Sequence, residues 1–265
     1  MSKGIALVTG GTKGIGKTLC LRLKDAGYQV FSASRSKSLP QGMDGITQIS
    51  VDFSNSLETR SFAQKFLEQY GVPKLLINNA GYGAFYEWAD FPEEEINRQI
   101  QVLFSSPVEL CRIFAPAMAE QSRGVIVNLS SLATLYPLPF MPLYNAGKAA
   151  LSSFTQTMML EYDNHPIFFD FRLGDISSEF NNAQSKQKKI NWTEKMKRAW
   201  IQIEKQLIHS PSPQYAAKKI YKVIFRKKSG VYYAGGFLQS RIAPTFARFL
   251  NQKALKFLLH NRYFR

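Results

Sequence analysis

Short, nearly continuous apolar runs alternate along this chain with longer segments in which apolar residues recur every three or four positions. Nearly continuous apolar runs are typical of parallel strands that are buried on both faces of a sheet. We expect such strands at residues 4–10, 28–34, 74–81, 124–131 and 229–236.

The longer segments have the spacing of amphipathic helices. The segment at 91–121 begins near Pro92, which suits a first helical turn, and continues with three glutamates at the positive end of the helix dipole. Further helices are expected at 16–27, 59–71, 143–151 and 210–225. Strands and helices in alternation imply right-handed crossovers, so the pattern predicts an α/β fold with a doubly wound parallel sheet.

Of the 265 residues, 45% are hydrophobic and 20% are charged, which suits one globular domain over residues 1–265. No stretch approaches 18 uninterrupted apolar residues, and a cytoplasmic protein is expected.

Cys20 and Cys111 lie in apolar helical patterns typical of buried thiols, so no disulfide is expected. The three histidines fall in separate segments, and we expect no metal site.

The formal net charge of +15 is compatible with nucleic acid, an anionic membrane surface, or anionic substrates and cofactors as partners. Residues 237–265 contain no acid and mix cations with aromatic and aliphatic side chains. This basic amphipathic extension suits a helix in a membrane interface, and thus a peripheral membrane contact. A docked helix or a subunit contact is the open alternative. Since no recognition motif for nucleic acid is present, no such partner is expected.

A glycine-rich loop, "TGGTKGIG" at residues 9–16, joins the first expected strand to the first expected helix. Gly10, Gly14 and Gly16 allow a tight turn, a close approach to a pyrophosphate, and packing of the helix on the sheet. The helix N-terminus offers free N–H groups and a positive dipole to an anion. Between a strand and a helix, this pattern predicts a nucleotide site.

Three more motifs follow in order: "NNAG" at 78–81, Ser131 at the end of an expected strand, and Tyr144 four residues before Lys148. On a helix, positions four apart share one face, and alone such a pair would be read as a solvated helix surface. The combination resembles the short-chain dehydrogenase/reductase family over residues 4–236. The resemblance implies a Rossmann-type fold with helices on both faces, transfer of hydride between a nicotinamide cofactor and a carbonyl or alcohol, and a homodimer or homotetramer.

The choice of cofactor depends on the end of the second expected strand. Enzymes that prefer NAD place an acid there for the ribose hydroxyls. Here Ser34 takes that place and Arg35 follows, so a guanidinium is available for a 2′-phosphate. Lys13 adds a second cation from the glycine loop. These residues favour NADP(H).

The family resemblance also implies which residues contact the cofactor. Adenine would lie against Asp52 and Phe53, and the ribose against Asn79, Ala80 and Gly81. The nicotinamide carboxamide would be held by Ile176 and Ser178, beside Gly174, where the family's usual Pro-Gly pair is replaced by Leu-Gly. The loop would supply Gly10, Thr12, Lys13, Gly14, Ile15 and Gly16.

Tyr144 is the expected proton donor. An unperturbed tyrosine is a poor acid near neutral pH, and an ammonium one turn away is expected to lower its pKa. In a reduction Tyr144 would protonate the carbonyl oxygen that Ser131 holds, while Lys148 would also bind the nicotinamide ribose.

One position departs from the family pattern. The family places an asparagine on the preceding long helix as part of a proton supply, and here the register gives Leu103. Gln101 lies about 200° around the helix from it and is a poor substitute. Two interpretations follow: an active enzyme with an altered proton supply, which we favour, or an NADP(H)-binding regulatory or scaffold protein with weak or no turnover.

The substrate pocket is expected to be built by three segments: residues 82–88, residues 132–143, and a substrate lid at 179–213. The first two are rich in aromatic and aliphatic residues, which suits a hydrophobic, lipid-like or acyl carbonyl substrate. The alternative is that several of these residues belong to the core. The lysines and arginines of the lid would be a solvated face or would meet a phosphate-bearing carrier or lipid head group.

Overall fold

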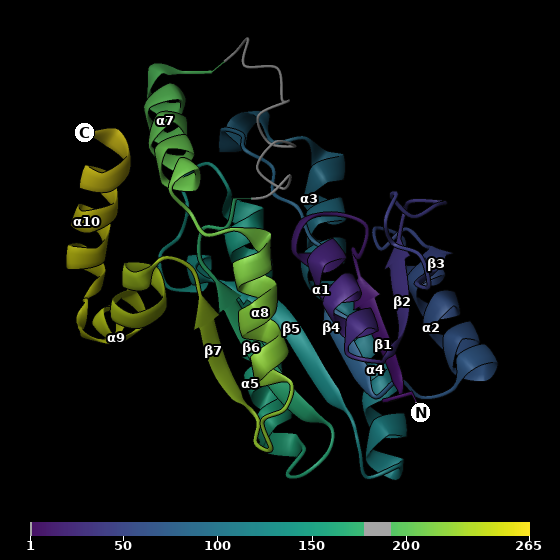
Figure 1. The fold of residues 1–265 in the computed structure, drawn as a ribbon. Coiled ribbons are helices and arrows are strands. Elements are labelled where there is room, and N and C mark those ends of the chain that lie inside the picture. The colour runs from purple at the N-terminus through teal and green to yellow at the C-terminus, as the bar shows by residue number, and fades with distance from the viewer. Residues whose placement is uncertain (1, 178–191) are drawn as a thin grey trace.

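A computed structural model describes residues 2–177 and 192–265. Seven parallel strands form one sheet in the order β3-β2-β1-β4-β5-β6-β7 (Figure 1). The order reverses between β1 and β4, and such a switch point opens a crevice at the carboxyl ends of the strands. The strands are β1 (Ile5–Thr9), β2 (Gln29–Ser34), β3 (Thr47–Ser50), β4 (Leu75–Asn78), β5 (Val125–Ser131), β6 (Ile167–Leu173) and β7 (Gly230–Ala234).

Helices cover both faces of the sheet, which confirms the predicted doubly wound α/β fold (Figure 1). One face carries α1 (Gly14–Asp25) and α8 (Pro213–Val223), which pack on each other as well as on the strands. The other face carries α2 (Ser56–Tyr70), α4 (Ser106–Glu120) and α5 (Pro142–Glu161).

Alternation along the strands explains the two cores. In β1, Ala6 and Val8 pack toward α1, whereas Leu7 packs toward α2 and α4, and all three are fully buried. Side chains of successive strand residues point to opposite faces, so a strand between two helical layers must be apolar throughout. This explains the continuous apolar runs in the sequence.

The expected helix at 91–121 is continuous in space but is not α-helical throughout. It comprises α3 (Glu93–Ile100), a π-helical turn η2 (Gln101–Ser105) and α4. By length and composition Glu93–Glu120 is the one helix among the described residues that could cross a membrane. Here Leu103, Leu110 and Phe114 of this segment are buried in the protein.

The C-terminal extension forms a helical layer at the β7 end of the sheet, opposite β3 (Figure 1). Its last helix packs against α7 (Glu194–Ile208), where Arg262 Nη2 donates to Gln206 Oε1 at 2.7 Å. Tyr263 is 3% exposed. The extension therefore includes a docked helix. Its elements are η5 (Leu238–Ile242), α9 (Ala243–Phe246), η6 (Ala247–Phe249) and α10 (Gln252–Phe264).

Both cysteines are buried and unpaired, Cys20 in α1 and Cys111 in α4. Burial raises the pKa of each thiol to about 12.

The described residues contain no cluster of three His, Cys, Asp or Glu side chains that could hold a metal ion. Two short 3₁₀ turns, η1 (Trp88–Asp90) and η3 (Leu132–Thr134), complete the chain's described elements.

Candidate active site

A cavity of about 790 Å³ runs along the carboxyl ends of the strands. One end is lined by the glycine loop between β1 and α1. The other end is lined by α7 and by the C-terminal extension, including Phe246 and Tyr263. Its size is in the range of ordinary ligand sites, and it lies at the topological switch point where α/β proteins bind ligands.

The glycine loop has the backbone that its sequence predicts. Gly10 and Gly14 have φ values of +67° and +50°, which favour glycine. A Cβ on Gly16 would lie 2.2 Å from the Gly10 carbonyl oxygen, so no side chain fits there. Asn79 Nδ2 fixes the loop to the end of β4 by donating to the carbonyls of Thr9 and Gly10, at 2.8 Å and 3.1 Å.

The loop presents an anion cradle to the cavity. Helix α1 begins at Gly14 and has no acidic residue in its first turn, so its positive end is not neutralised. A close backbone approach and a free helix N-terminus fit the pyrophosphate of a dinucleotide. Of the predicted loop residues, five line the cavity and Gly16 packs behind them. The five are Gly10, Thr12, Lys13, Gly14 and Ile15.

The end of β2 places a hydroxyl and a guanidinium at the cavity wall. Ser34 is buried, and its Oγ accepts a hydrogen bond from Gln48 Nε2 at 3.0 Å and lies 3.5 Å from Thr12 Oγ1. Arg35 is exposed and lines the same cavity as Lys13. Among the described residues, Arg35 makes no ion pair with a carboxylate. Its charge is therefore available to a ligand.

The other predicted cofactor contacts lie along the same wall. Asp52, Phe53, Asn79, Ala80 and Gly81 all line the cavity. Burial acts to raise the pKa of Asp52, but hydrogen bonds from Ser54 and the charges of Arg35 and Arg98 outweigh it and lower that pKa.

At the far end of β6, Gly174 and Ile176 also line the cavity. A Cβ on Gly174 would lie 2.5 Å from Gln239 Oε1, so the Gln239 side chain would have to move to make room for it. The predicted contact Ser178 lies outside the described residues.

The three predicted catalytic residues meet in the middle of the cavity. Ser131 ends β5, and its Oγ donates to the Leu173 carbonyl at 3.3 Å. Tyr144, in the first turn of α5, shares a side-chain hydrogen bond with Ser131. Lys148 follows one turn later, and all three line the cavity. Because β5 and α5 are adjacent in space, residues 13 and 17 positions apart along the chain come together.

Lys148 is a buried ammonium group. Its Nζ donates to the Leu129 carbonyl at 2.6 Å. Burial lowers the pKa of Lys148 to about 8, while the charge of Asp170 acts to raise it. Asp170 is fully buried and is held by hydrogen bonds from Ser130, Ser152 and Arg172.

The expected lowering of the Tyr144 pKa is wrong in direction. Burial raises the pKa of Tyr144, the hydrogen bond with Ser131 acts to lower it, and the charge of Asp175 raises it further. The physical reason is that loss of water around the phenol disfavours the phenolate. In addition, the ammonium of Lys148 donates to the carbonyl of Leu129.

Leu103 occupies the position that its register predicts. A Cβ on Gly81 would lie 3.2 Å from Leu103 Cδ2 and 3.4 Å from Lys148 Nζ. The Leu103 side chain and the Lys148 ammonium group therefore face the same glycine. Gln101 does not substitute for the missing amide, because its Nε2 donates to Ser106 Oγ at 3.0 Å. The π-helical turn at 101–105 coincides with this departure from the family pattern, and such turns are frequent at functional sites.

The segments expected to build the substrate pocket divide between pocket and core. From residues 132–143, five line the cavity: Leu132, Ala133, Tyr136, Leu138 and Met141. Phe85 is instead fully buried in a cluster with Trp192 and Trp200. The first part of the expected lid, 179–191, lies outside the described residues. The rest contains α7, which contributes Ile203, Gln206 and Leu207 to the cavity wall.

Sequence reasoning missed several residues of the cavity wall. Arg98 lies at the cofactor end, while Asp175, Gln239 and Arg262 lie toward the other end. Tyr82, which also lines the cavity, belongs to the segment 82–88 that was expected to build the pocket. Asp175 is one residue beyond a predicted contact, so a carboxylate beside the expected nicotinamide site was the available signal. The C-terminal residues carried no local signal, because only the tertiary fold brings them to the cavity.

Comparison with known proteins identifies the family of this chain. The family model for the short chain dehydrogenase matches residues 4–189. A 3-ketodihydrosphingosine reductase of Bacteroides thetaiotaomicron is 28% identical over 234 residues, which cover 86% of each chain. A very-long-chain 3-oxoacyl-CoA reductase of Anas platyrhynchos is 34% identical over 175 residues, which are 61% of this chain and 56% of that relative. The chain therefore spans little more than half of the second relative's length.

Solved structures share the fold. A short-chain dehydrogenase from Streptomyces avermitilis has a TM-score of 0.78 and 20% identity, covering 98% of this chain and 97% of its own. One from Burkholderia phymatum in complex with NAD also has a TM-score of 0.78 and 20% identity, covering 97% and 95%. With the family model matching most of the chain, the protein belongs to the short-chain dehydrogenase family of oxidoreductases.

Proposed function

We propose that this protein is an NADP(H)-dependent oxidoreductase that interconverts a carbonyl and an alcohol on a hydrophobic, lipid-like or acyl substrate. The observation that carries the proposal is the meeting of Ser131, Tyr144 and Lys148 in one cavity with the glycine loop. A helix-surface role would leave Lys148 solvated, whereas this ammonium is 6% exposed and faces the cavity.

The preference for NADP(H) is supported by the charges at the cofactor end. Arg35 and Lys13 line the cavity next to Ser34, and a 2′-phosphate there would meet cations and hydroxyl groups. An acid at the end of β2 would repel that phosphate, and the chain has none at 34 or 35.

In the proposed reduction the nicotinamide supplies hydride to the carbonyl carbon. The Ser131 hydroxyl holds the carbonyl oxygen, and Tyr144 donates the proton that this oxygen takes up. The raised pKa of Tyr144 keeps the phenol protonated, although it also makes the phenol a weaker acid. Lys148 supports the tyrosine and binds the nicotinamide ribose, and Asp170 balances its charge inside the protein.

A hydrophobic substrate is supported by the apolar wall beyond the catalytic residues. Leu132, Met141, Ile203, Leu207 and Ile242 contribute to it. Two relatives are named for ketone reductions on long chains, 3-ketodihydrosphingosine and very-long-chain 3-oxoacyl-CoA. Both names are consistent with the apolar character of this wall.

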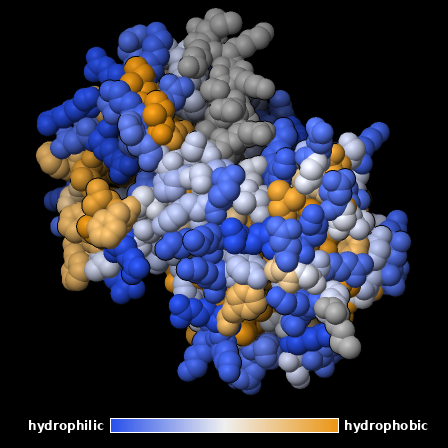
Figure 2. All heavy atoms as spheres, viewed as in Figure 1, coloured by the Kyte–Doolittle hydropathy of each residue, from blue (hydrophilic) through white to orange (hydrophobic). Residues whose placement is uncertain are grey.

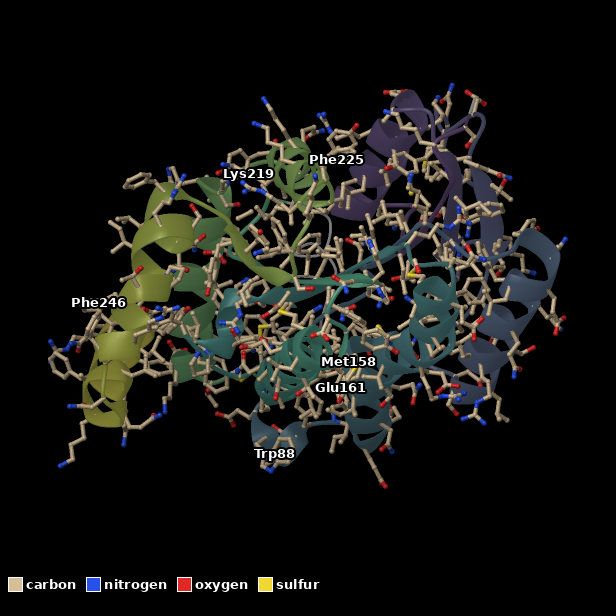
Figure 3. All side chains as sticks on the ribbon, turned by 90° about the horizontal axis from the view of Figure 1, so that it is seen from below. Trp88, Met158, Glu161, Lys219, Phe225 and Phe246 are labelled. Atoms are coloured by element: carbon tan, nitrogen blue, oxygen red, sulfur yellow. The ribbon has the colours of Figure 1, made fainter. Side chains whose placement is uncertain are left out.

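The C-terminal extension is proposed to contact an anionic lipid surface. Figure 2 shows apolar side chains gathered on the outside of this region, and Figure 3 places Phe246 on the outer side of the C-terminal helices. Leu238, Ile242, Phe246 and Leu258 both line the cavity and are 40–66% exposed. The cavity therefore opens among apolar side chains in a segment free of acids, which suits entry of a lipid-like substrate. A homodimer or homotetramer remains a prediction.

The test follows NADPH oxidation with a panel of ketones, aldehydes and 3-ketoacyl thioesters, repeated with NADH. Tyr144→Phe removes only the hydroxyl and is expected to abolish turnover while NADPH still binds. Turnover that needs Tyr144 and prefers NADPH would support the proposal. If NADPH binds and no carbonyl is reduced, the alternative is favoured, namely an NADP(H)-binding regulatory or scaffold protein. Leu103 is the observation that favours this alternative.

A further inference from the structure

Asp175 places a carboxylate on the wall of the cavity, beside the catalytic residues. It follows Gly174 just beyond the end of β6, is half-buried, and lines the cavity. Its charge acts on the phenols of Tyr144 and Tyr263, so it lies between the reacting centre and the C-terminal helix.

The backbone and one side chain fix this carboxylate. Gly174 N donates to the Ala234 carbonyl at 2.7 Å, which ties the end of β6 to β7. Asp175 N donates to Gln239 Oε1 at 3.0 Å, and Gln239 Nε2 donates in return to Asp175 Oδ2. The position of Asp175 is thus set by β6, β7 and η5 together.

The pairing of strands β5 and β6 brings Asp175 close to Ser131. In the sheet Ser131 pairs with Leu173, and the Ser131 hydroxyl donates to the Leu173 carbonyl. Asp175 is two residues beyond Leu173. Since the charge of Asp175 also acts on Tyr144, a group bound to its carboxylate would lie on the same side of the cavity as a carbonyl held by Ser131.

The proposed reduction has no use for this carboxylate. Its negative charge disfavours a tyrosinate, so it does not assist Tyr144. Among the described residues Gln239 is its one hydrogen-bond partner, and no Lys or Arg forms an ion pair with it. Arg262 acts on it at longer range while donating to Gln206. A half-buried carboxylate with one side-chain donor can bind a cation that enters the cavity.

We propose that Asp175 is a binding site for a protonated amine, and that the substrate is a long-chain ketone with an amino group close to the carbonyl. This inference rests on the proposed function and narrows its substrate class. The apolar wall would hold the chain, Ser131 and Tyr144 the carbonyl oxygen, and Asp175 the ammonium group.

The first test is equilibrium binding in the presence of NADP⁺, using decylamine and decanol as probes. The two share a chain and differ in the charge of the head group. Wild-type protein is expected to bind decylamine about tenfold or more tightly than decanol, since hydrogen bonds between charged partners are the stronger class. Asp175→Asn keeps the size and can still accept from Gln239, and it is expected to remove this preference without weakening decanol binding.

Asp163→Asn is the matched control, because Asp163 is exposed and outside the cavity. Equal affinities of wild type for the two probes would overturn the proposal without any variant. An equal loss of affinity for both probes in a folded Asp175→Asn protein would also overturn the proposal, because it would indicate a structural role for Asp175.

A second readout compares kcat/KM for a long-chain 2-amino-3-ketone with that for the same ketone without the amine. Wild type is expected to favour the amino ketone, and Asp175→Asn to lose that preference. Reduction of both ketones at equal rates would overturn the amine site and leave the reductase intact. Amine binding at Asp175 with no reduction of either ketone would instead contradict the proposed reductase activity.

Discussion

Leu103 packs so closely on Gly147 that a Cβ on the glycine would lie 2.9 Å from the leucine Cβ. The neighbour of Gly147 is Lys148, so an apolar side chain fills the space beside the ammonium group. Leu103→Asn would bury an amide in a fully enclosed site, and we expect a loss of about 1–3 kcal/mol in the free energy of unfolding. Under the favoured interpretation, an active enzyme with an altered proton supply, we expect no gain in kcat.

Chemical denaturation and steady-state kinetics check this prediction, with Leu103→Met as a control that keeps the site apolar. A tenfold rise in kcat for Leu103→Asn would show that leucine limits turnover, and would favour the regulatory alternative for the natural chain.

Arg35 is expected to set the choice of cofactor. Arg35→Ser removes the guanidinium from an exposed position, so stability should change little. The KM for NADPH is expected to rise about tenfold or more, since one charge-assisted contact is lost, while the KM for NADH stays nearly constant. Arg22→Ser, which lies outside the cavity, is the control. A parallel rise in both KM values would mean that Arg35 does not recognise the 2′-phosphate.

The buried ammonium of Lys148 predicts an alkaline limit to the reduction. Its pKa is lowered from 10.5 to about 8, so the charge is present below pH 8 and is lost as the pH rises through that value. We expect kcat/KM for carbonyl reduction to fall above about pH 8, while Tyr144, whose pKa is raised, stays protonated.

Lys148→Arg tests whether Lys148, and not Tyr144, is the group that titrates, because a guanidinium stays charged throughout this range. A less active but pH-independent variant is expected between pH 7 and 9. The same alkaline fall in Lys148→Arg would assign the titration to a different group.

The glycine loop predicts a sharp difference between two alanine substitutions. Gly16→Ala would bring a methyl group to 2.2 Å from the Gly10 carbonyl, so the loop must shift and NADPH binding should be lost or weakened at least tenfold. Gly236→Ala meets no atom within 4 Å and should bind NADPH like wild type. Fluorescence titration with NADPH measures both. Unchanged affinity in Gly16→Ala would exclude this loop as the pyrophosphate site.

The exposed C-terminal phenylalanines predict binding to anionic vesicles. Phe246→Ser with Phe249→Ser should reduce cosedimentation with mixed phosphatidylcholine and phosphatidylglycerol vesicles several-fold, because 49% and 81% of these side chains are exposed. Trp88→Ser, which changes an exposed tryptophan away from that region in Figure 3, is the matched control. Equal binding of the double variant and wild type would contradict the proposed lipid contact.

The sequence predicts the first half of the fold well because local patterns determine it there. Strands β1, β2, β4 and β5 lie in short, nearly continuous apolar runs, and the apolar residues of the helices between them recur every three or four positions. Strand β6 is less evident, since Asp170 and Arg172 interrupt its apolar run. Only the folded chain shows that Asp170 balances buried cations. Strand β3 is four residues long and has no apolar run at all.

For the candidate site, motifs predicted the residues that local spacing brings together. The Ser131, Tyr144 and Lys148 group and the glycine loop are of this kind. The C-terminal side of the substrate end could not be predicted, because α10 reaches it from more than 100 residues away along the chain. The direction of the Tyr144 pKa was missed for a related reason, since burial depends on the whole cavity.

The two enclosed thiols have a practical consequence for labelling experiments. With pKa values of about 12, Cys20 and Cys111 are almost entirely protonated at neutral pH and shielded from reagents. The chain has no other cysteine. A single cysteine introduced in place of Phe249 would thus take up a maleimide dye or spin label alone, without prior removal of the native residues, and would report directly on the environment of the C-terminal surface.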